Sequence, residues 1–246
     1  MDAAAERPRN PGLLELRVAD DPEAWTAAGF TVDGDEVRID PIAVRLTGRP
    51  DDGPRGITGW TVAGMAIADG SLDGLRTDDR SEAERAAPTN SSPSFPPEPE
   101  PGSPVHPNGT VGLDHVVVLT PDLDRTIAAC EAAGLDLRRV RETTASGSPV
   151  RQAFFKLGPV VLEVVSGDVG AGLPAADAPA TFWGLAIDVA DLDETAASMG
   201  EGLGRIKTAV QRGRRIATIR TQALDISTAI AAMDHHADRT TPDDGR

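Results

Sequence analysis

A twelve-residue segment occurs twice in this chain. LDHVVVLTPDLD, residues 113–124, returns as FWGLAIDVADLD, residues 182–193, at an offset of 69 residues. Each copy reads as a strand followed by the start of a helix, and such an internal repeat indicates one supersecondary unit used twice. His115 of the first copy is replaced by Gly184 in the second. We therefore expect two equivalent modules that share a cleft, with a potential ligand missing from one wall.

The residues that follow each copy predict the rest of a module. After the first copy, Thr120 can cap a helix, and two β-type runs follow at residues 151–157 and 160–165. The second copy is followed by weaker signals of the same kind, a helix over 191–199 and strands over 214–220 and 226–233. Strand, helix and two or three strands make one βαβββ module.

This arrangement resembles the vicinal oxygen chelate superfamily of glyoxalases, bleomycin resistance proteins and extradiol dioxygenases, in particular its glyoxalase-like bacterial members. The resemblance covers residues 112–233 and rests on LDHVVVLTPDLD, VVLEVVSG and the echo IDVADLD. It implies an α+β fold in which tandem βαβββ modules form a curved sheet that encloses a cleft. It also implies a small-molecule ligand in that cleft.

The resemblance further implies a divalent metal ion, such as Zn, Ni, Mn or Fe, held by a His and a Glu of each module. His115 in LDHV and Glu163 in VLEV match the pair of the first module. The corresponding positions of the second module fall at Gly184 and at about Ala231, and neither residue can bind a metal. The resemblance therefore implies an incomplete metal site, with Glu163 also the candidate catalytic carboxylate.

The alternation of residues along strands bears on the same pair. It places His115 on one face with Leu113 and Val117, and leaves Glu163 as a lone carboxylate in an apolar strand. Burying an unpaired charge is costly, so three explanations stay open: Glu163 binds a metal with His115, pairs with His115 or an arginine, or faces solvent in a cleft. A stable metal site generally needs at least three protein ligands.

Three further residues are candidate substrate-binding groups. Arg151 and Arg214 precede the penultimate strands of the two modules, where guanidinium groups would suit a carboxylate or phosphate. The alternative is that they are solvated or pair with Glu163. Asp188 is predicted to share a face with His115, but it lies four residues beyond Gly184, roughly 13 Å along a strand, so it cannot replace the missing ligand directly.

Composition limits the classes of partner. The net charge is −15, with 24 basic residues against 39 acidic ones, which argues against nucleic-acid binding. Cys130 is the only cysteine, which excludes a disulfide within the chain and suits a reducing cytoplasm. Neither a signal peptide nor a membrane span is recognisable. We expect a cytoplasmic protein that could form a homodimer.

The chain divides into four parts by pattern. Residues 1–76 predict an abbreviated α/β unit that itself resembles a βαβββ module, with a helix capped by Asp21. Residues 77–109 are rich in Pro, Ser and Glu and are predicted to be a disordered linker, ending in the turn HPNG. The paired modules occupy 110–234, and 235–246 form a polar tail.

Two classes of function remain open at this point. The loss of ligands at Gly184 and Ala231 favours a metal-free protein that binds a small molecule in the cleft. The alternative is a divalent-metal-dependent lyase, isomerase or dioxygenase of the glyoxalase type, whose site is completed by water, substrate or a second chain. The sequence does not identify the ligand.

Overall fold

The computed structural model describes residues 11–67, 69–79, 105–145, 147–167 and 175–235. Within them, two consecutive βαβββ modules build one eight-stranded sheet. The first module comprises β8 (Thr110–Leu119), α3 (Leu123–Ala132), β9 (Asp136–Ala145), β10 (Ser148–Leu157) and β11 (Val160–Ser166). The second comprises β12 (Thr181–Val189), α4 (Leu192–Met199), η1 (Gly200–Gly202), β13 (Lys207–Thr208), β14 (Arg215–Thr218), η2 (Thr221–Leu224) and β15 (Ala229–Asp234). The tandem modules predicted from the repeat are confirmed.

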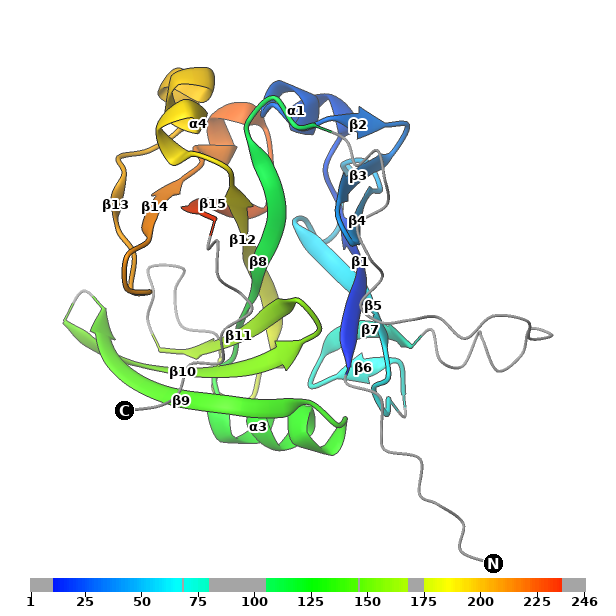
Figure 1. Ribbon diagram of the computed structural model, residues 1–246. Helices are drawn as coiled ribbons and strands as arrows, with labels where there is room; N and C mark the ends of the chain where they lie inside the picture. The colour runs from blue at the N-terminus through cyan, green and yellow to red at the C-terminus, as the bar shows by residue number, and fades with distance from the viewer. Residues whose placement is uncertain (1–10, 68, 80–104, 146, 168–174, 236–246) are drawn as a thin grey trace, which may run out of the picture.

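The first strands of the two modules lie at the centre of this sheet. β8 and β12 run antiparallel to one another, and each is parallel to the last strand of its own module, β11 or β15. Figure 1 shows the sheet curling, with α3 and α4 on its outer side. Val116 and Val118 of β8 and Leu185 and Ile187 of β12 are buried in the core on that side. The intervening residues therefore face the concave side of the sheet.

The N-terminal unit is a more complete copy of the same plan than the sequence suggests. It contains β1 (Gly12–Val18), α1 (Pro22–Ala27), β2 (Val32–Asp33), β3 (Glu36–Ile39) and β4 (Ile42–Leu46), with β1 parallel to β4 as β8 is to β11. β5 (Ile57–Ala63), β6 (Ser71–Leu72) and β7 (Leu75–Asp79) follow, with β5 antiparallel to β1 and parallel to β7. These three strands repeat the pairing of the second module without a helix, so four related modules are present.

The N-terminal sheet packs against the outer side of the paired modules. The ring of Trp60 in β5 meets that of Phe182 in β12 edge to face, with centroids 5.2 Å apart. Asp73 accepts hydrogen bonds from Arg125 of α3, the shorter at 2.8 Å. Buried apolar residues of both units form one continuous core. The N-terminal unit thus packs on the outer side of the paired-module sheet.

The HPNG turn is part of the joint between the two units. The side chain of Asn108 donates to Ala28 O at 3.0 Å, and its backbone N–H donates to Gly29 O at 3.0 Å. Gly29 has φ of 80°, and a Cβ there would lie 2.9 Å from that of Asn108. His106 is only 4% exposed and contacts the backbone of β3. His106 of the predicted turn is therefore a buried residue of the joint and not an exposed one.

Several predicted boundaries differ in detail. Residues 77–79 belong to β7 and residues 105–109 to the joint, whereas the rest of the predicted linker, 80–104, lies outside the described residues. The side chain of Asp122, rather than Thr120, caps α3 by accepting from Arg125 N at 3.0 Å. Asp21 occupies the N-cap position of α1, but its side chain accepts from Arg49 N instead. No helix of the described residues is long and apolar enough to cross a membrane.

Candidate functional site

A β-bulge in β8 sets the geometry of the concave side. Ala186 of β12 lies opposite His115, but the next residue, Ile187, lies opposite Leu113, so Asp114 is an extra residue in β8. Leu113 is buried in the core instead of sharing the face of His115, which corrects the prediction from simple alternation. The bulge brings the Asp114 carboxylate beside the His115 ring, with Oδ1 2.8 Å from Nδ1.

The structure brings His115 and Glu163 together on the concave side. Nε2 of His115 lies 3.5 Å from Oε2 of Glu163, and the two side chains are 14% and 15% exposed. The other carboxylate oxygen of Glu163 accepts a hydrogen bond of 2.5 Å from Nε2 of Gln152. The lone carboxylate of the apolar strand is therefore paired with both a histidine and an amide, which answers the question of its burial.

Arg214 is fully occupied by other protein groups. Its Nη1 lies 2.6 Å from Oδ2 of Asp114, its Nη2 contacts Asp188, and its Nε donates to Asp234 O at 2.7 Å. The side chains of Arg214 and Asp188 are 7% and 1% exposed. The expectation that these two residues contact a ligand is not supported, because a buried guanidinium and its two carboxylates are satisfied by one another.

The contacts of Asp114 with His115 and Arg214 determine its pKa. Burial alone would raise the pKa of Asp114, but hydrogen bonds and charge from His115 and Arg214 outweigh it and hold the pKa well below its usual range. Asp114 is therefore a carboxylate at neutral pH, and it links the Arg214 guanidinium to the His115 ring. A continuous polar network runs from Glu163 through His115 and Asp114 to Arg214 and Asp188.

Arg151 lies on the other side of the sheet. Its guanidinium pairs with Asp124 of α3 at 2.9 Å and approaches Glu142 at 3.7 Å. Along β10, Ala153 and Phe155 share that face and are buried in the core. The prediction that Arg151 opens toward the cleft is therefore wrong. The concave side of β10 instead carries Gln152, one residue further along.

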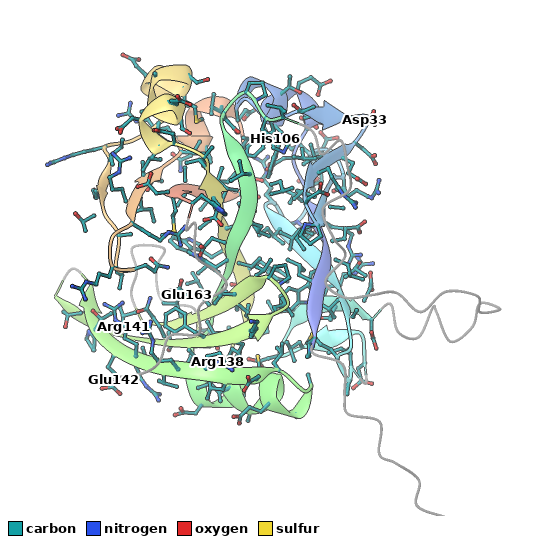
Figure 2. All side chains as sticks on the ribbon, in the orientation of Figure 1. Asp33, His106, Arg138, Arg141, Glu142 and Glu163 are labelled. Atoms are coloured by element: carbon teal, nitrogen blue, oxygen red, sulfur yellow. The ribbon has the colours of Figure 1, made fainter. Side chains whose placement is uncertain are left out.

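Sequence reasoning missed two residues on the concave side, Gln152 and Arg141. Arg141 of β9 lies directly opposite Gln152 of β10, so their side chains share a face. Figure 2 shows Arg141 and Glu163 within the curl of the sheet, with Glu142 on the outer side of β9. The position of Gln152 could have been predicted from the alternation in RQAFF. Ala153 and Phe155 are the apolar residues that pack in the core, so Gln152, which precedes Ala153, faces the opposite, concave side.

The side chains present do not make a complete metal centre. In the first module Glu163 lies opposite Val117. In the second module Ala231 lies opposite Ala186, which is the residue that the repeat aligns with Val117. Ala231 is therefore the counterpart of Glu163. A Cβ on Gly184, the counterpart of His115, would lie 2.3 Å from Ala229 O. Among the described residues, no three His, Cys, Asp or Glu side chains are grouped so that they could hold a metal ion. His115 and Glu163 alone fall short of the usual three protein ligands.

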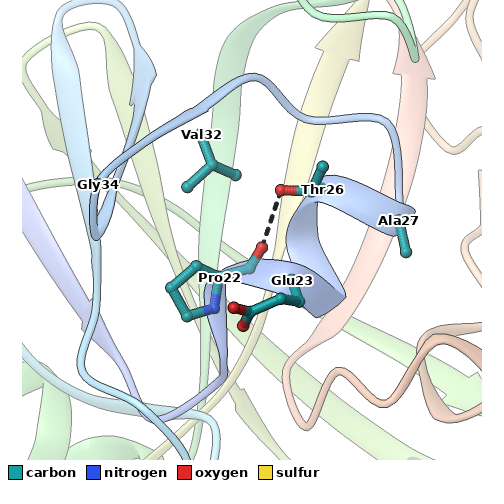
Figure 3. Close-up of a pocket in the computed structure, with 6 residues that line it drawn as sticks. All are labelled: Pro22, Glu23, Thr26, Ala27, Val32 and Gly34. Carbon is teal, nitrogen blue, oxygen red and sulfur yellow. Dashed lines mark hydrogen bonds between the residues drawn. The ribbon is translucent and has the colours of Figure 1, made fainter.

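A separate hollow lies in the N-terminal unit. It has a volume of about 410 Å³ and is lined by Pro22, Glu23, Thr26, Ala27, Val32 and Gly34 (Figure 3). The Thr26 hydroxyl already donates to Pro22 O at 3.0 Å, which leaves Glu23 as the charged group of the lining. None of the predicted site residues lies there, and the polar network of the concave side remains the candidate site.

A sequence comparison identifies the superfamily of the paired modules. Residues 114–218 match the model of the glyoxalase, bleomycin resistance protein and dioxygenase superfamily. The paired-module region belongs to this superfamily. The match begins at Asp114 and contains His115 and Glu163, so the candidate site lies within the region that defines the superfamily. No curated protein matches the chain in sequence.

Solved structures of similar fold extend the likeness to the N-terminal unit. A mutant of 4-hydroxymandelate synthase from Streptomyces coelicolor matches 95% of this chain and 94% of its own, with a TM-score of 0.59 at 15% identity. A catechol 2,3-dioxygenase matches 98% and 97%, with 0.53 at 15%. A variant of homoprotocatechuate 2,3-dioxygenase from B. fuscum matches 99% and 77%, with 0.53 at 11%. At these identities the likeness shows the fold, including the N-terminal modules, and the chemistry must be argued from the site.

Proposed function

We propose that this protein binds a small molecule at the concave side of the paired-module sheet, without a tightly held metal ion of its own. The single observation that carries the proposal is the contact of His115 with Glu163, 3.5 Å apart, on a face where both counterpart positions lack a ligand. The pair offers a ring nitrogen and a carboxylate oxygen side by side, each partly exposed. Such a pair suits hydrogen bonding to a polar ligand group.

Asp114 supports this role by fixing the imidazole. A carboxylate that holds Nδ1 of a histidine sets the orientation of the ring and directs Nε2 toward the face where Glu163 lies. Because Asp114 is itself held by Arg214, the ring is oriented before any ligand arrives. Preorganised polar groups lose less entropy on binding than mobile ones, which favours affinity.

The same contact favours a second candidate. Histidines that bind metals usually pass their other ring nitrogen to a carboxylate, as His115 does to Asp114. A weak divalent site completed by water, substrate or a second chain would convert the protein into a metal-dependent enzyme of the glyoxalase type. With two protein donors, such a site is expected to be substoichiometrically occupied after purification.

Elemental analysis combined with ligand screening separates the two candidates. The protein, purified without a His tag, is assayed for bound metal and for binding of a mixture of neutral, cationic and anionic fragments by ligand-observed NMR. The His115→Ala and Glu163→Gln variants are the matched tests. Fragment binding that both variants weaken, with no stoichiometric metal, supports the proposal.

Two outcomes would overturn it. One tightly held ion per chain, lost in both variants and accompanied by turnover of a 2-oxoaldehyde hemithioacetal, restores the metal-dependent enzyme. Fragment binding that neither variant alters places the functional surface elsewhere. Arg138→Ala is the control for nonspecific effects, because Arg138 is exposed and pairs with Asp136.

A further inference from the structure

We infer that Arg141 and Gln152 select the ligand of the concave side, and that this ligand is a small carboxylate which also carries a hydroxyl group. The inference rests on the proposed function, because it names the class of ligand for the same face. Three features of the described residues carry it: a buried acceptor with no donor among them, a cation with no counterion among them, and an apolar strip beside both.

The acceptor is the side-chain oxygen of Gln152. Its Nε2 donates to Glu163 at 2.5 Å, which fixes the amide so that Oε1 points away from the carboxylate. Oε1 is buried and accepts no hydrogen bond from any group in the described part of the chain. Burying a polar atom without a hydrogen-bond partner costs free energy. A ligand group that donates a hydrogen bond to Oε1 would therefore supply what the described residues do not.

The cation is Arg141, directly across from Gln152. Its side chain is half-buried, and within the described ranges no carboxylate lies at ion-pairing distance from it. Three other arginines of the paired modules are engaged: Arg214 by two carboxylates, Arg151 by Asp124, and Arg139 over the ring of Phe154 at 5.1 Å. Arg141, directly across from Gln152, is thus available to a ligand carboxylate.

The order of charges across the strands orients such a ligand. Arg141 is on the outermost strand, Gln152 on the next, and Glu163 on the third. A ligand carboxylate is attracted to Arg141 and repelled by Glu163, so it belongs at the β9 end. A hydroxyl next to that carboxylate then points toward Gln152, where it can donate to Oε1. Neither a plain cation nor a plain anion satisfies both ends.

An apolar strip continues from Gln152 along the same face. Val165 lies directly opposite Gln152, and it packs with Val117, Val150 and Leu119 in a small cluster apart from the main core. Branched aliphatic side chains offer contacts to a branched aliphatic group of a ligand. The chemical class is therefore a 2-hydroxycarboxylate with a short, branched apolar body.

Three matched compounds test the inference by isothermal titration calorimetry. They are 2-hydroxy-4-methylpentanoate, 4-methylpentanoate without the hydroxyl, and 2-hydroxy-4-methylpentanamide without the charge. We expect the hydroxy acid to bind most tightly. Arg141→Met should weaken its binding by about tenfold or more, the loss that corresponds to one charged hydrogen bond. Gln152→Met should abolish the preference for the hydroxy acid over 4-methylpentanoate.

The matched control is Arg138→Met, the same change three residues away on β9, at a side chain 63% exposed and paired with Asp136. It should leave all three affinities unchanged. Circular dichroism and thermal unfolding of each variant establish that it is folded.

The outcomes distinguish the inference from the function on which it rests. If the amide binds as well as the acid, or the acid without the hydroxyl as well as the hydroxy acid, the inference is overturned. Failure of all three compounds to bind also overturns it. The proposed function survives any of these results if the fragment mixture still shows binding that His115→Ala weakens, and it falls with the inference if that binding is absent.

Discussion

His115 meets Glu163 across two neighbouring strands without being its direct partner. The register places Val161 opposite His115 and Val117 opposite Glu163, so the 3.5 Å approach of Nε2 to Oε2 is diagonal. The residue directly opposite each of the two side chains is a valine. The pair consequently stands among valines at one end of the polar network that runs through Asp114 to Arg214, and hydrogen bonds are stronger in such low-polarity surroundings than in water.

Arg214 should be essential for stability rather than for ligand binding. Arg214→Met removes the buried guanidinium that Asp114 and Asp188 share, and breaking a buried ion pair in this way costs about 3–5 kcal/mol in the free energy of unfolding. Urea denaturation of the variant measures the loss. Adding Asp114→Asn and Asp188→Asn to Arg214→Met should recover part of it, because the two buried negative charges are then removed together with the positive one. Equal stability of Arg214→Met and the unaltered protein would contradict the assigned role.

The sequence predicts the fold of the paired modules well because their signals are local. The repeat, the helix starts and the apolar runs each depend on residues close in the chain, and the strands fall where these signals place them. The resemblance to the superfamily is confirmed by the match over residues 114–218. The β-type character of DLRRVRETTA, which forms β9, is weak in sequence because its alternation is charged on both faces.

The candidate site is predicted less well because it depends on one bulge and on side-chain direction. A strict alternation from Leu113 cannot reveal that Asp114 is inserted opposite Ala186 and Ile187, and this insertion is what joins Asp114 to His115. Likewise, an arginine next to a strand is easily predicted to bind a ligand when the side of the sheet on which its side chain lies is not known. Arg214 proves to neutralise carboxylates of two other strands, a long-range relationship that local patterns do not encode.

Gly184 should not tolerate any side chain. In Gly184→Ala the added Cβ would lie 2.3 Å from Ala229 O, so β12 and β15 must separate. We expect a loss of about 1–3 kcal/mol in the free energy of unfolding, typical of overpacking. Gly112→Ala in the adjoining strand is the control, since its Cβ would meet nothing closer than 3.7 Å. A stable Gly184→His variant that gains a tight metal site would show that the strand can yield, contrary to this prediction.

Cys130 should be inert in the folded protein. Burial raises the pKa of its thiol to about 12, with the charges of Asp73 and Glu131 acting in the same direction. The thiolate is the reactive form, so an aromatic disulfide reagent at neutral pH should label no thiol until the protein is unfolded in urea, where one thiol per chain reacts. Rapid labelling under native conditions would mean that α3 opens far more often than its packing suggests.

His106 should make the joint between the units sensitive to mild acid. Its Nδ1 accepts from Thr31 N at 3.0 Å, and its Nε2 lies 2.9 Å from Arg38 O, an arrangement that only the neutral ring can satisfy. Burial lowers the pKa of His106 below its ordinary value of 6.5. The folded state therefore binds the proton less readily than the unfolded state does. Its stabilising contribution is complete above the unfolded pKa and is lost as the pH falls below it, toward the folded pKa.

The measurement is the free energy of unfolding in urea between pH 8 and pH 5, for the unaltered protein and for His106→Gln. Within this range a single histidine contributes a slope of up to about 1.4 kcal/mol per pH unit. The two proteins differ only at residue 106, so subtracting the two curves isolates the contribution of His106. The difference in stability should be largest at pH 8 and shrink toward pH 5, because protonation then removes what the substitution has already removed. A difference that is constant across the range would show that the ring stays neutral or that its titration does not reach the joint.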